Sequence, residues 1–272
     1  MPEPLVTIVI PTYNDAPHHL AEAIASVHVQ SYPHVELIVV DDGSDVPVQV
    51  DGVRVIRQQN AGVSAARNSG IRSGTGEFVI CLDGDDRLSA NFAAEAVDVL
   101  VDPQVTIASP AVQRFGAGSG RWADSGKSFT LPDFGNRSPV AVASAFRRTD
   151  WEKAGGYDED PAMRSGHEDH EWWIRLLGRC GGRAQPMPTA VLHYRIRPDS
   201  RFHGGDLAYA ERVTRERIVA NNDPATVEAL LWGAWSHSDR VEKQLERARS
   251  SNVRAWVWRA RKRVRKSVRV AR

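Results

Sequence analysis

Three aspartates lie close together after an apolar run: Asp83, Asp85 and Asp86, with one glycine between the first two. Carboxylate oxygens are the ligands that Mg²⁺ and Mn²⁺ prefer, and these ions usually keep coordination positions open for substrate phosphates. Three like charges this close repel one another, and a bound metal would relieve the repulsion. The cluster therefore predicts a metal site for a phosphorylated substrate. A solvated acidic turn is the alternative interpretation.

Two other apolar runs also end in polar residues, at 11–15 (PTYND) and at 41–44 (DDGS). In open α/β sheets, ligands bind outside the carboxyl ends of the strands. If all three runs are strands of one parallel sheet, their polar ends converge on one site. Taken singly, each end is equally typical of an ordinary turn.

Two further segments could contribute chemistry. The segment 58–68 brings small residues to the start of a predicted helix, where Arg67 could bind a phosphate or a base, although an exposed arginine is the alternative. Glu168 and Asp169 begin another predicted helix. There the helix dipole is expected to keep a carboxylate ionised, so that it could serve as a general base or simply cap the helix.

The elements that must position these residues alternate along the first hundred residues. Short β-branched runs predict strands at 6–10, 36–40, 53–56 and 77–82, and helical spacing predicts helices from 15, at 64–71 and at 90–101. This order predicts an α/β fold with a parallel, helix-covered sheet. No GxGxxG motif follows the first strand and no P-loop is present, which argues against a dinucleotide oxidoreductase and a P-loop kinase.

The rest of the chain is less regular. Residues 103–150 are rich in Gly, Ser and Pro and are expected to form loops and short strands. A helix is expected at 167–177, a strand at 191–197, and helices from 206 onward with a break near 221–224. We therefore expect three parts: a catalytic domain at 1–205, a helical extension at 206–250 and a basic amphipathic tail at 251–272.

Composition sets broad limits. The 272 residues carry a formal net charge of +1, so the molecule as a whole is not a polyanion binder. Two cysteines without metal-ligand spacing predict a reducing, cytoplasmic location. We see no signal peptide and no apolar run long enough to span a bilayer.

The motifs in their order resemble family 2 glycosyltransferases with the GT-A fold. The likeness covers about residues 4 to 200 and rests on VTIVIPTYN at 6–14, VVDDGS at 39–44, NAG at 60–62 with ARN at 66–68, LDGDD at 82–86, GGYDE at 155–159, and Glu168-Asp169. It implies a Rossmann-like, mostly parallel central sheet flanked by helices, with a C-terminal helical extension. It also implies an inverting transfer of a hexosyl or N-acetylhexosaminyl group, most commonly from a UDP-sugar, to an acceptor hydroxyl with Mn²⁺ or Mg²⁺.

The resemblance also assigns roles to residues. The nucleotide-binding set would be Pro11, Thr12, Tyr13, Asp15, Asp42, Asn60, Gly62, Arg67, Asp83 and Gly84. Within it, Tyr13 would stack on the base and Asp42 would accept a hydrogen bond from it. Asp85 would bind the metal together with Asp83. Asp169 would be the catalytic base, and Glu168 would position it or contact the acceptor. Ser144 and Ala145 would lie beside the donor sugar and the acceptor.

One departure from the family pattern concerns the third metal ligand. Many members carry a late Tyr-Arg-x-His segment whose histidine helps to bind the metal. Here the segment reads Tyr194-Arg195-Ile196-Arg197, so an arginine stands in place of that histidine. Arg197 could bind the diphosphate directly, and His193 or His203 could supply an imidazole instead.

The C-terminal tail has a distinct composition. Residues 253–272 contain nine Arg or Lys and no acid, with Trp256 and Trp258 near the start. Such a basic amphipathic helix is typical of segments that bind an anionic membrane surface, where lipid-linked acceptors are found. Nucleic acid or another polyanion is a second possible partner, although no specific nucleic acid is expected, and a solvated tail with no partner is the third interpretation.

The expected function is therefore sugar transfer to a glycan, lipid-linked or small-molecule acceptor, as in cell-envelope polysaccharide, glycan or glycolipid biosynthesis. The location would be the cytoplasm, including the inner face of the membrane. Two alternatives remain: a non-catalytic module that binds a nucleotide sugar, and a sugar-nucleotide pyrophosphorylase. The latter would need a glycine-rich basic loop after the first strand, where 11–15 (PTYND) stands.

Overall fold

The central sheet contains five strands in the order β3-β2-β1-β4-β8. The computed structural model describes residues 3–122, 126–197, 206–240 and 243. β1 (Val6–Thr12) pairs in parallel with β2 (Val35–Asp41) and β4 (Phe78–Cys81), β2 pairs in parallel with β3 (Arg54–Arg57), and β8 (Phe146–Arg147) adds an antiparallel edge. The predicted mostly parallel sheet is confirmed.

A second sheet has the order β5-β9-β6-β7. Its strands are β5 (Arg87–Leu88), β6 (Val105–Gly116), β7 (Gly120–Arg121) and β9 (Arg183–Ile196). The expectation of loops and short strands at 103–150 was therefore wrong for β6, whereas β7 and β8 have two residues each. Pro110 interrupts the β-branched pattern there, and the register of β6 against β9 shifts between Ser109 and Ala111, so a bulge lets a 12-residue strand continue.

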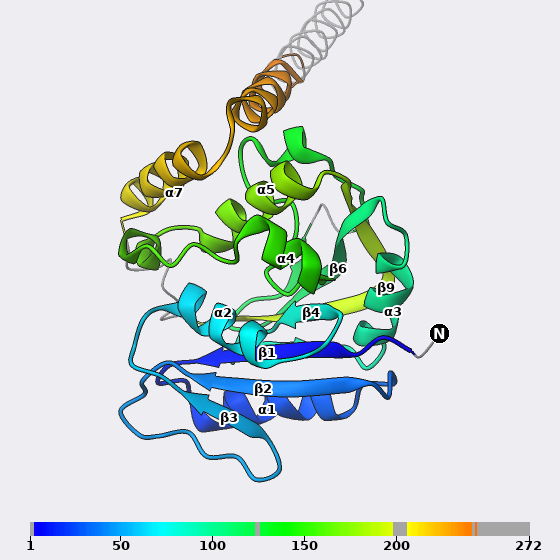
Figure 1. Ribbon diagram of the computed structural model, residues 1–272, viewed down its shortest axis with the longest axis vertical. Coiled ribbons are helices and arrows are strands. Elements are labelled where there is room, and N and C mark those ends of the chain that lie inside the picture. Colours follow the sequence, from blue (N-terminus) through cyan, green and yellow to red (C-terminus); the bar gives the residue numbers. More distant parts are fainter. Residues whose placement is uncertain (1–2, 123–125, 198–205, 241–242, 244–272) are drawn as a thin grey trace, which may run out of the picture.

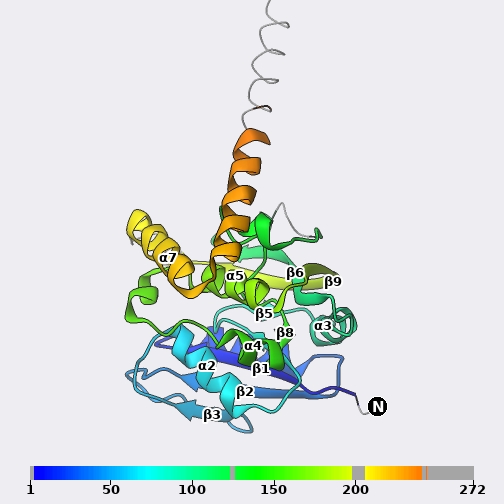
Figure 2. The ribbon, with the colours of Figure 1, turned by 45° about the horizontal axis from the view of Figure 1, so that its top comes forward.

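Helices cover both faces of the central sheet (Figures 1 and 2). Their bounds are α1 (Pro17–His28), α2 (Val63–Ser73), α3 (Phe92–Leu100), α4 (Arg148–Ala154), α5 (Glu168–Cys180) and α7 (Leu207–Asn221), with 3-10 turns η1 (Leu131–Phe134) and η2 (Pro161–Ser165).

Alternation along the strands divides the core into two clusters. On β1, Ile8 and Ile10 belong to the cluster that contains the apolar faces of α1 and α3, whereas Val9 belongs to the cluster of α2, α4 and α5. Trp172 and Trp173 of α5 are fully buried in the second cluster. α5 thus packs its aromatic side chains against the sheet, and this fixes the position of its first turn.

The C-terminal part begins with α7, which packs on α5 and η2. A second helix follows at 224–240, and the predicted break near 221–224 is confirmed. The basic tail at 251–272 and His203 lie outside the described residues. None of the helices in the described ranges is long and apolar enough to cross a membrane.

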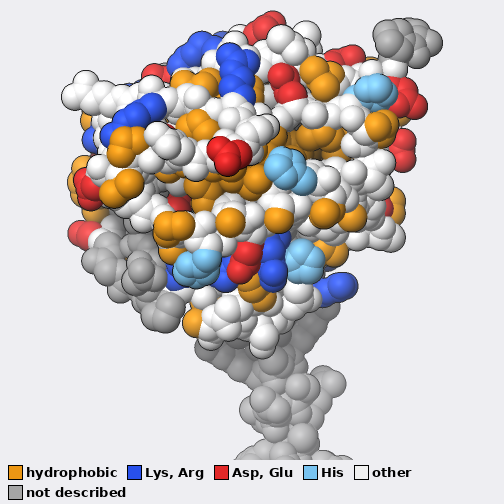
Figure 3. Space-filling view, turned by 90° about the horizontal axis from the view of Figure 1, so that it is seen from below, with side chains coloured by type: hydrophobic (Ala, Val, Ile, Leu, Met, Phe, Trp, Pro, Cys, Tyr) orange, Lys and Arg blue, Asp and Glu red, His pale blue; other side chains and the backbone are white. Residues whose placement is uncertain are grey.

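Acidic and basic side chains alternate with apolar ones on the face seen from below the view of Figure 1 (Figure 3). This face therefore presents a mixed surface rather than one continuous basic patch.

The two free cysteines differ in their exposure to solvent, because Cys81 is fully buried in the core and Cys180 is half-buried.

Candidate active site

The polar ends of β1, β2 and β4 meet at one edge of the sheet, as the sequence predicts. The backbone N–H of Asp42 donates to the carbonyl of Thr12 at 2.9 Å, and the N–H of Asn14 donates to Ser44 Oγ at 3.0 Å. A side-chain Cβ at Gly84 would lie 2.7 Å from Asp15 Oδ2. Only glycine therefore lets the loop after β4 pack this closely against the loop after β1.

Asp42 organises the loop at 58–62. Its Oδ1 accepts hydrogen bonds from Gln58 Nε2 at 2.8 Å and Ala61 N at 2.9 Å, and its Oδ2 accepts from Gly62 N at 2.8 Å. Gly62 has φ of 95°, a conformation that favours glycine. Asp42, which was expected to hydrogen-bond the base, thus stabilises the loop that forms one wall of the site. A contact between Asp42 and the base stays a prediction.

Two further side chains could offer an aromatic ring and a cation at this edge of the sheet. Tyr13 is 51% exposed, so its ring is accessible for stacking. Arg164, from η2, donates to the carbonyl of Asn60 at 3.3 Å, and its stem lies against Gly62. The sequence analysis missed Arg164. No sequence signal links it to the loop at 58–62, because the contact joins residues about a hundred positions apart.

Arg67 joins two parts of the site from within the core. Its side chain is only 1% exposed, with Nη2 donating to Asp83 Oδ1 at 2.8 Å and Nη1 donating to Glu168 Oε1 at 3.0 Å. The alternative of an exposed arginine is excluded. The guanidinium positions two acids, and a direct contact of Arg67 with the base or the diphosphate stays a prediction.

The acidic side chains at this edge lie in an environment that disfavours their charge. Burial and the neighbouring Asp83 raise the pKa of Asp85 to about 6. Burial, Asp83 and Asp85 raise the pKa of Asp86, whose side chain is almost fully buried. Burial also raises the pKa of Asp15. The repulsion expected from the sequence is thus present in the fold.

Two arginines at the end of β9 meet this acidic group. The backbone N–H of Arg195 donates to Asp86 Oδ1 at 2.7 Å, and its Nε donates to the carbonyl of Asp85 at 2.8 Å. Arg197 Nε lies 3.1 Å from Asp85 Oδ2, and its Nη1 lies 3.7 Å from Asp15 Oδ1. Arg197 was a predicted site residue, whereas Arg195 was not. The available signal was their two-residue spacing, because residues i and i+2 of extended backbone point to one face.

The expected metal ligands are not assembled as a set. Asp83 accepts from Arg67, and Asp85 is paired with Arg197. His193 pairs across the sheet with Arg87, and burial followed by the charge of Arg87 lowers its pKa. Among the described residues, no group of three His, Cys, Asp or Glu side chains could hold a metal ion. The described residues therefore do not form a three-ligand metal site.

Asp169 lies in the first turn of α5, where its Oδ1 accepts from the backbone N–H of His170 at 2.9 Å. The sequence analysis expected the helix dipole to keep this group ionised. Instead, burial and the neighbouring Glu168 raise the pKa of Asp169 to about 7, although Arg67 acts in the opposite direction. Desolvation thus outweighs the helix dipole, and the carboxylate is placed to accept a proton near neutral pH.

Ser144 and Ala145 do not lie on the surface of the site. Both are fully buried, with Ser144 Oγ donating to the carbonyl of Ala141 at 2.7 Å and Ala145 paired with Ala108. Their side chains therefore pack within the core where β6 and β8 meet, and a ligand could reach only their neighbours.

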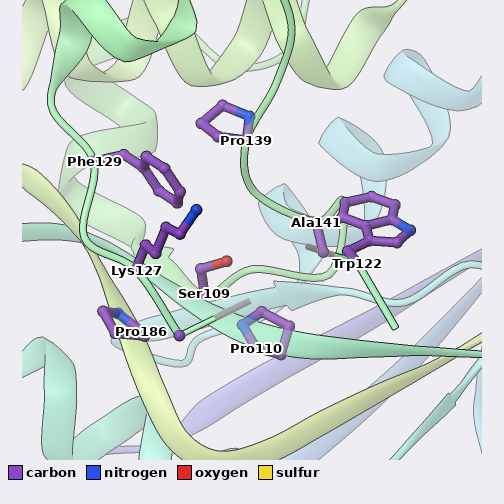
Figure 4. Close-up of a pocket in the computed structure, with 9 residues that line it drawn as sticks. Ser109, Pro110, Trp122, Lys127, Phe129, Pro139, Ala141 and Pro186 are labelled. Carbon is purple, nitrogen blue, oxygen red and sulfur yellow. The ribbon is translucent and has the colours of Figure 1, made fainter. Parts of the chain in front are cut away.

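A small cleft lies beyond the acidic group on the side of β6. Its lining combines apolar, aromatic and basic side chains, as Figure 4 shows: Ser109, Pro110, Trp122, Gly126, Lys127, Phe129, Pro139, Ala141 and Pro186. The Trp122 ring lies 6.2 Å from the ring of Tyr194, whose pKa is raised to about 12 by burial and by nearby Asp86. Tyr194 thus lies near both Trp122 of the cleft and the acidic group.

Comparison with known protein families gives one match. The model described as glycosyl transferase family 2 matches residues 7–165, which span the first five motifs of the sequence analysis. This range is more than half of the chain.

Individual relatives match a shorter range. Glycosyltransferase GlyA of Streptococcus pneumoniae is 31% identical over 112 residues, covering 38% of this chain and 16% of the relative. The uncharacterized glycosyltransferase EpsJ of Bacillus subtilis is 38% identical over 96 residues, covering 32% of this chain and 28% of the relative. The chain thus matches less than a third of the length of these curated relatives.

Solved structures extend the likeness in the fold. The crystal structure of S. aureus TarS 1–349 has a TM-score of 0.64 at 17% identity, covering 85% of this chain and 72% of that chain. The same protein in complex with UDP-GlcNAc has a TM-score of 0.66 at 16% identity, with coverages of 83% and 69%. At this identity the likeness establishes the fold alone.

Proposed function

The chain belongs to glycosyl transferase family 2, and from this premise we propose that it transfers a sugar from a UDP-sugar to an acceptor hydroxyl. The observation that carries this proposal is the place of Asp169. Its carboxylate, with a pKa raised to about 7, is linked through Glu168 and Arg67 to Asp83 at the end of β4. A proton acceptor and a candidate donor site are thus held by one buried arginine.

The donor nucleotide would bind across the ends of β1, β2 and β4. Tyr13, which is half exposed, would stack on the base, and the loop held by Asp42 would form the opposite wall. Asp83 would accept hydrogen bonds from the ribose. The UDP-GlcNAc complex of TarS, a protein of similar fold, supports a UDP-sugar as the donor class.

The reaction would be a single displacement. Asp169 accepts the proton of the acceptor hydroxyl while the hydroxyl oxygen attacks the anomeric carbon from the face opposite the diphosphate. The bond to the diphosphate breaks in the same step, so the configuration at the anomeric carbon inverts. The charge of Glu168, which accepts from Arg67, disfavours the charge of Asp169. No enzyme nucleophile is needed.

A divalent cation is part of the family pattern, and Asp83 and Asp85 are the carboxylates that would hold Mn²⁺ or Mg²⁺. Such an ion could bind Asp85 only by displacing Arg197 from its carboxylate. We therefore assign no step of the reaction to a metal. A hexosyl or N-acetylhexosaminyl group on UDP remains the proposed donor, and a glycan or lipid-linked hydroxyl in cell-envelope synthesis remains the proposed acceptor.

A panel of nucleoside diphosphates tests the donor class. A ligand that binds only the folded protein raises its unfolding temperature, so UDP is expected to give the largest rise among UDP, GDP, dTDP and CDP. Tyr13→Ala should reduce that rise, and Tyr209→Ala, which changes an exposed tyrosine on α7, is the matched control. A larger response to GDP or dTDP would overturn the uridine assignment and leave the family membership intact.

Two alternative functions can be distinguished from sugar transfer by the products of the reaction. A non-catalytic module would bind UDP-sugars without turnover, and a pyrophosphorylase would form the sugar nucleotide from a sugar phosphate and UTP. Release of UDP from a UDP-sugar, stimulated by an acceptor hydroxyl, is expected only of a transferase. Pyrophosphate release from UTP and a sugar phosphate would contradict the proposal.

A further inference from the structure

Arg197 follows the last residue of β9, and its place is fixed by the strand that precedes it. Arg195, two residues earlier, binds Asp86 through its backbone N–H and the carbonyl of Asp85 through its guanidinium. The Arg195 guanidinium also lies 4.4 Å from the ring centre of Phe115. The end of β9 is therefore attached to the loop at 83–86 at two points, independently of any bound ligand.

From this fixed point the Arg197 guanidinium bridges two loops. Its Nε lies 3.1 Å from Asp85 Oδ2 and its Nη1 lies 3.7 Å from Asp15 Oδ1. The side chain is 32% exposed, and among the described residues its ion pairs use Nε and Nη1. The guanidinium is thus held by two carboxylates while about a third of the side chain remains exposed.

The charge balance at this place favours a fixed cation over a metal ion. A divalent ion on Asp85 would lie within a few ångströms of a guanidinium that contacts the same carboxylate, and like charges at that distance repel strongly where water is partly excluded. A guanidinium offers several N–H donors in one plane and matches the oxygens of a phosphate.

We propose that Arg197 supplies the positive charge that meets the donor diphosphate, and that nucleoside diphosphate binding by this chain therefore requires no divalent cation. The inference rests on the proposed function, because it assumes that a diphosphate lies at the ends of β1 and β4. Asp85 and Asp15 then act as holders of Arg197 rather than as metal ligands. Arg197 is a binding residue for the leaving group, in the position where the family pattern has a metal-ligating histidine.

Calorimetric titration of the full chain with UDP tests this inference. The wild type is expected to bind UDP with the same affinity, within about twofold, in EDTA and in Mn²⁺. Arg197→Gln should weaken binding about 10- to 100-fold in both buffers, the usual effect of losing a hydrogen bond to a charged group. Arg197→His should show the same loss in EDTA and recover with Mn²⁺, because an imidazole beside Asp85 can share a metal.

The matched control is Arg183→Gln. Arg183 opens β9, pairs with Asp102 at 2.9 Å and is 34% exposed, so it resembles Arg197 in burial and pairing but lies at the other end of the strand. UDP affinity should be unchanged in this variant. Thermal unfolding of both glutamine variants checks that each is folded.

The inference fails if wild-type binding appears only with Mn²⁺, or if Arg197→Gln binds UDP as the wild type does. In either case UDP still binds, so the result contradicts the role of Arg197 without contradicting the proposed function. Absence of UDP binding to the wild type in both buffers overturns the proposed donor and, with it, this inference.

Discussion

The molecule contains two groups of acidic side chains that differ in their ion-pair partners. The strand-end acids (Asp15, Asp83, Asp85 and Asp86) lie beside Arg67, Arg195 and Arg197. The helix-start pair consists of Glu168, which is bound by Arg67, and Asp169, which forms no ion pair in the described structure. Arginine side chains therefore pair with Asp83, Asp85 and Asp15 of the first group. Asp86 accepts from the backbone N–H of Arg195. In the second group only Glu168 is paired within the described residues.

The difference indicates two kinds of chemistry. Arginines around the strand-end acids reduce their repulsion and fix the loops after β1 and β4, which suits the binding of a charged ligand. Asp169 has no such partner, and burial raises its pKa to about 7, which suits proton transfer. Arg67 connects the groups, since it binds Asp83 in one and Glu168 in the other.

The largest expected effect comes from removing the proton acceptor. Asp169→Asn keeps the size of the side chain but cannot take a proton, so transfer should fall by about 10² to 10⁴-fold while UDP binding is retained. Initial rates of UDP release and a UDP titration measure the two effects. Asp98→Asn, on an exposed position of α3, is the control. Undiminished turnover in Asp169→Asn would remove this residue from its proposed role.

The next largest effect comes from breaking the link between the two groups. Arg67→Gln leaves Asp83 and Glu168 without their buried partner, and loss of one partner of a buried pair usually costs about 3–5 kcal/mol in the free energy of unfolding. Urea denaturation measures this cost. Arg72→Gln, one turn later on α2 and 55% exposed, should cost less than about 1 kcal/mol. Equal costs for the two variants would show that Arg67 does not carry the connection.

The smallest effect expected is on the pH dependence of the rate. Asp169 must be deprotonated to accept a proton, and its raised pKa of about 7 means that this form is lost as the pH falls through 7. kcat/KM should therefore decline about tenfold per pH unit below pH 7 and level off above it. A pH profile of UDP release measures the inflection, which should be absent from the residual activity of Asp169→Asn. An inflection near pH 4 in the wild type would contradict the shift.

Much of the first half of the fold could be predicted from local patterns. β1, β2, β3 and β4 coincide with the predicted strands within about two residues, because short β-branched runs between turn residues are a local signal. β6 and the first half of β9 escaped prediction. Prolines at 110, 186 and 188 interrupt their pattern, and only their mutual pairing across a shifted register makes them strands.

In the candidate site, too, some features could be predicted from the sequence and others depend on the tertiary structure. The sequence located the acids at 83–86 and 168–169, since their types and spacing are properties of the chain alone. Which groups contact these acids was decided by the tertiary structure: Arg67, whose guanidinium binds Glu168, is 101 residues from it, and Arg195, whose backbone N–H binds Asp86, is 109 residues from it.

By itself, then, the sequence determined the family, the alternation of strands and helices in the first hundred residues, and the identity of the acidic groups, because these depend on neighbouring residues. Only the tertiary structure decided that Arg197 lies on Asp85 where a metal was expected, and that the half-buried Asp169 has no ion-pair partner among the described residues. Both depend on long-range packing and desolvation. A carboxylate has the same identity in any sequence context, but its charge is set by the groups that the fold brings within a few ångströms.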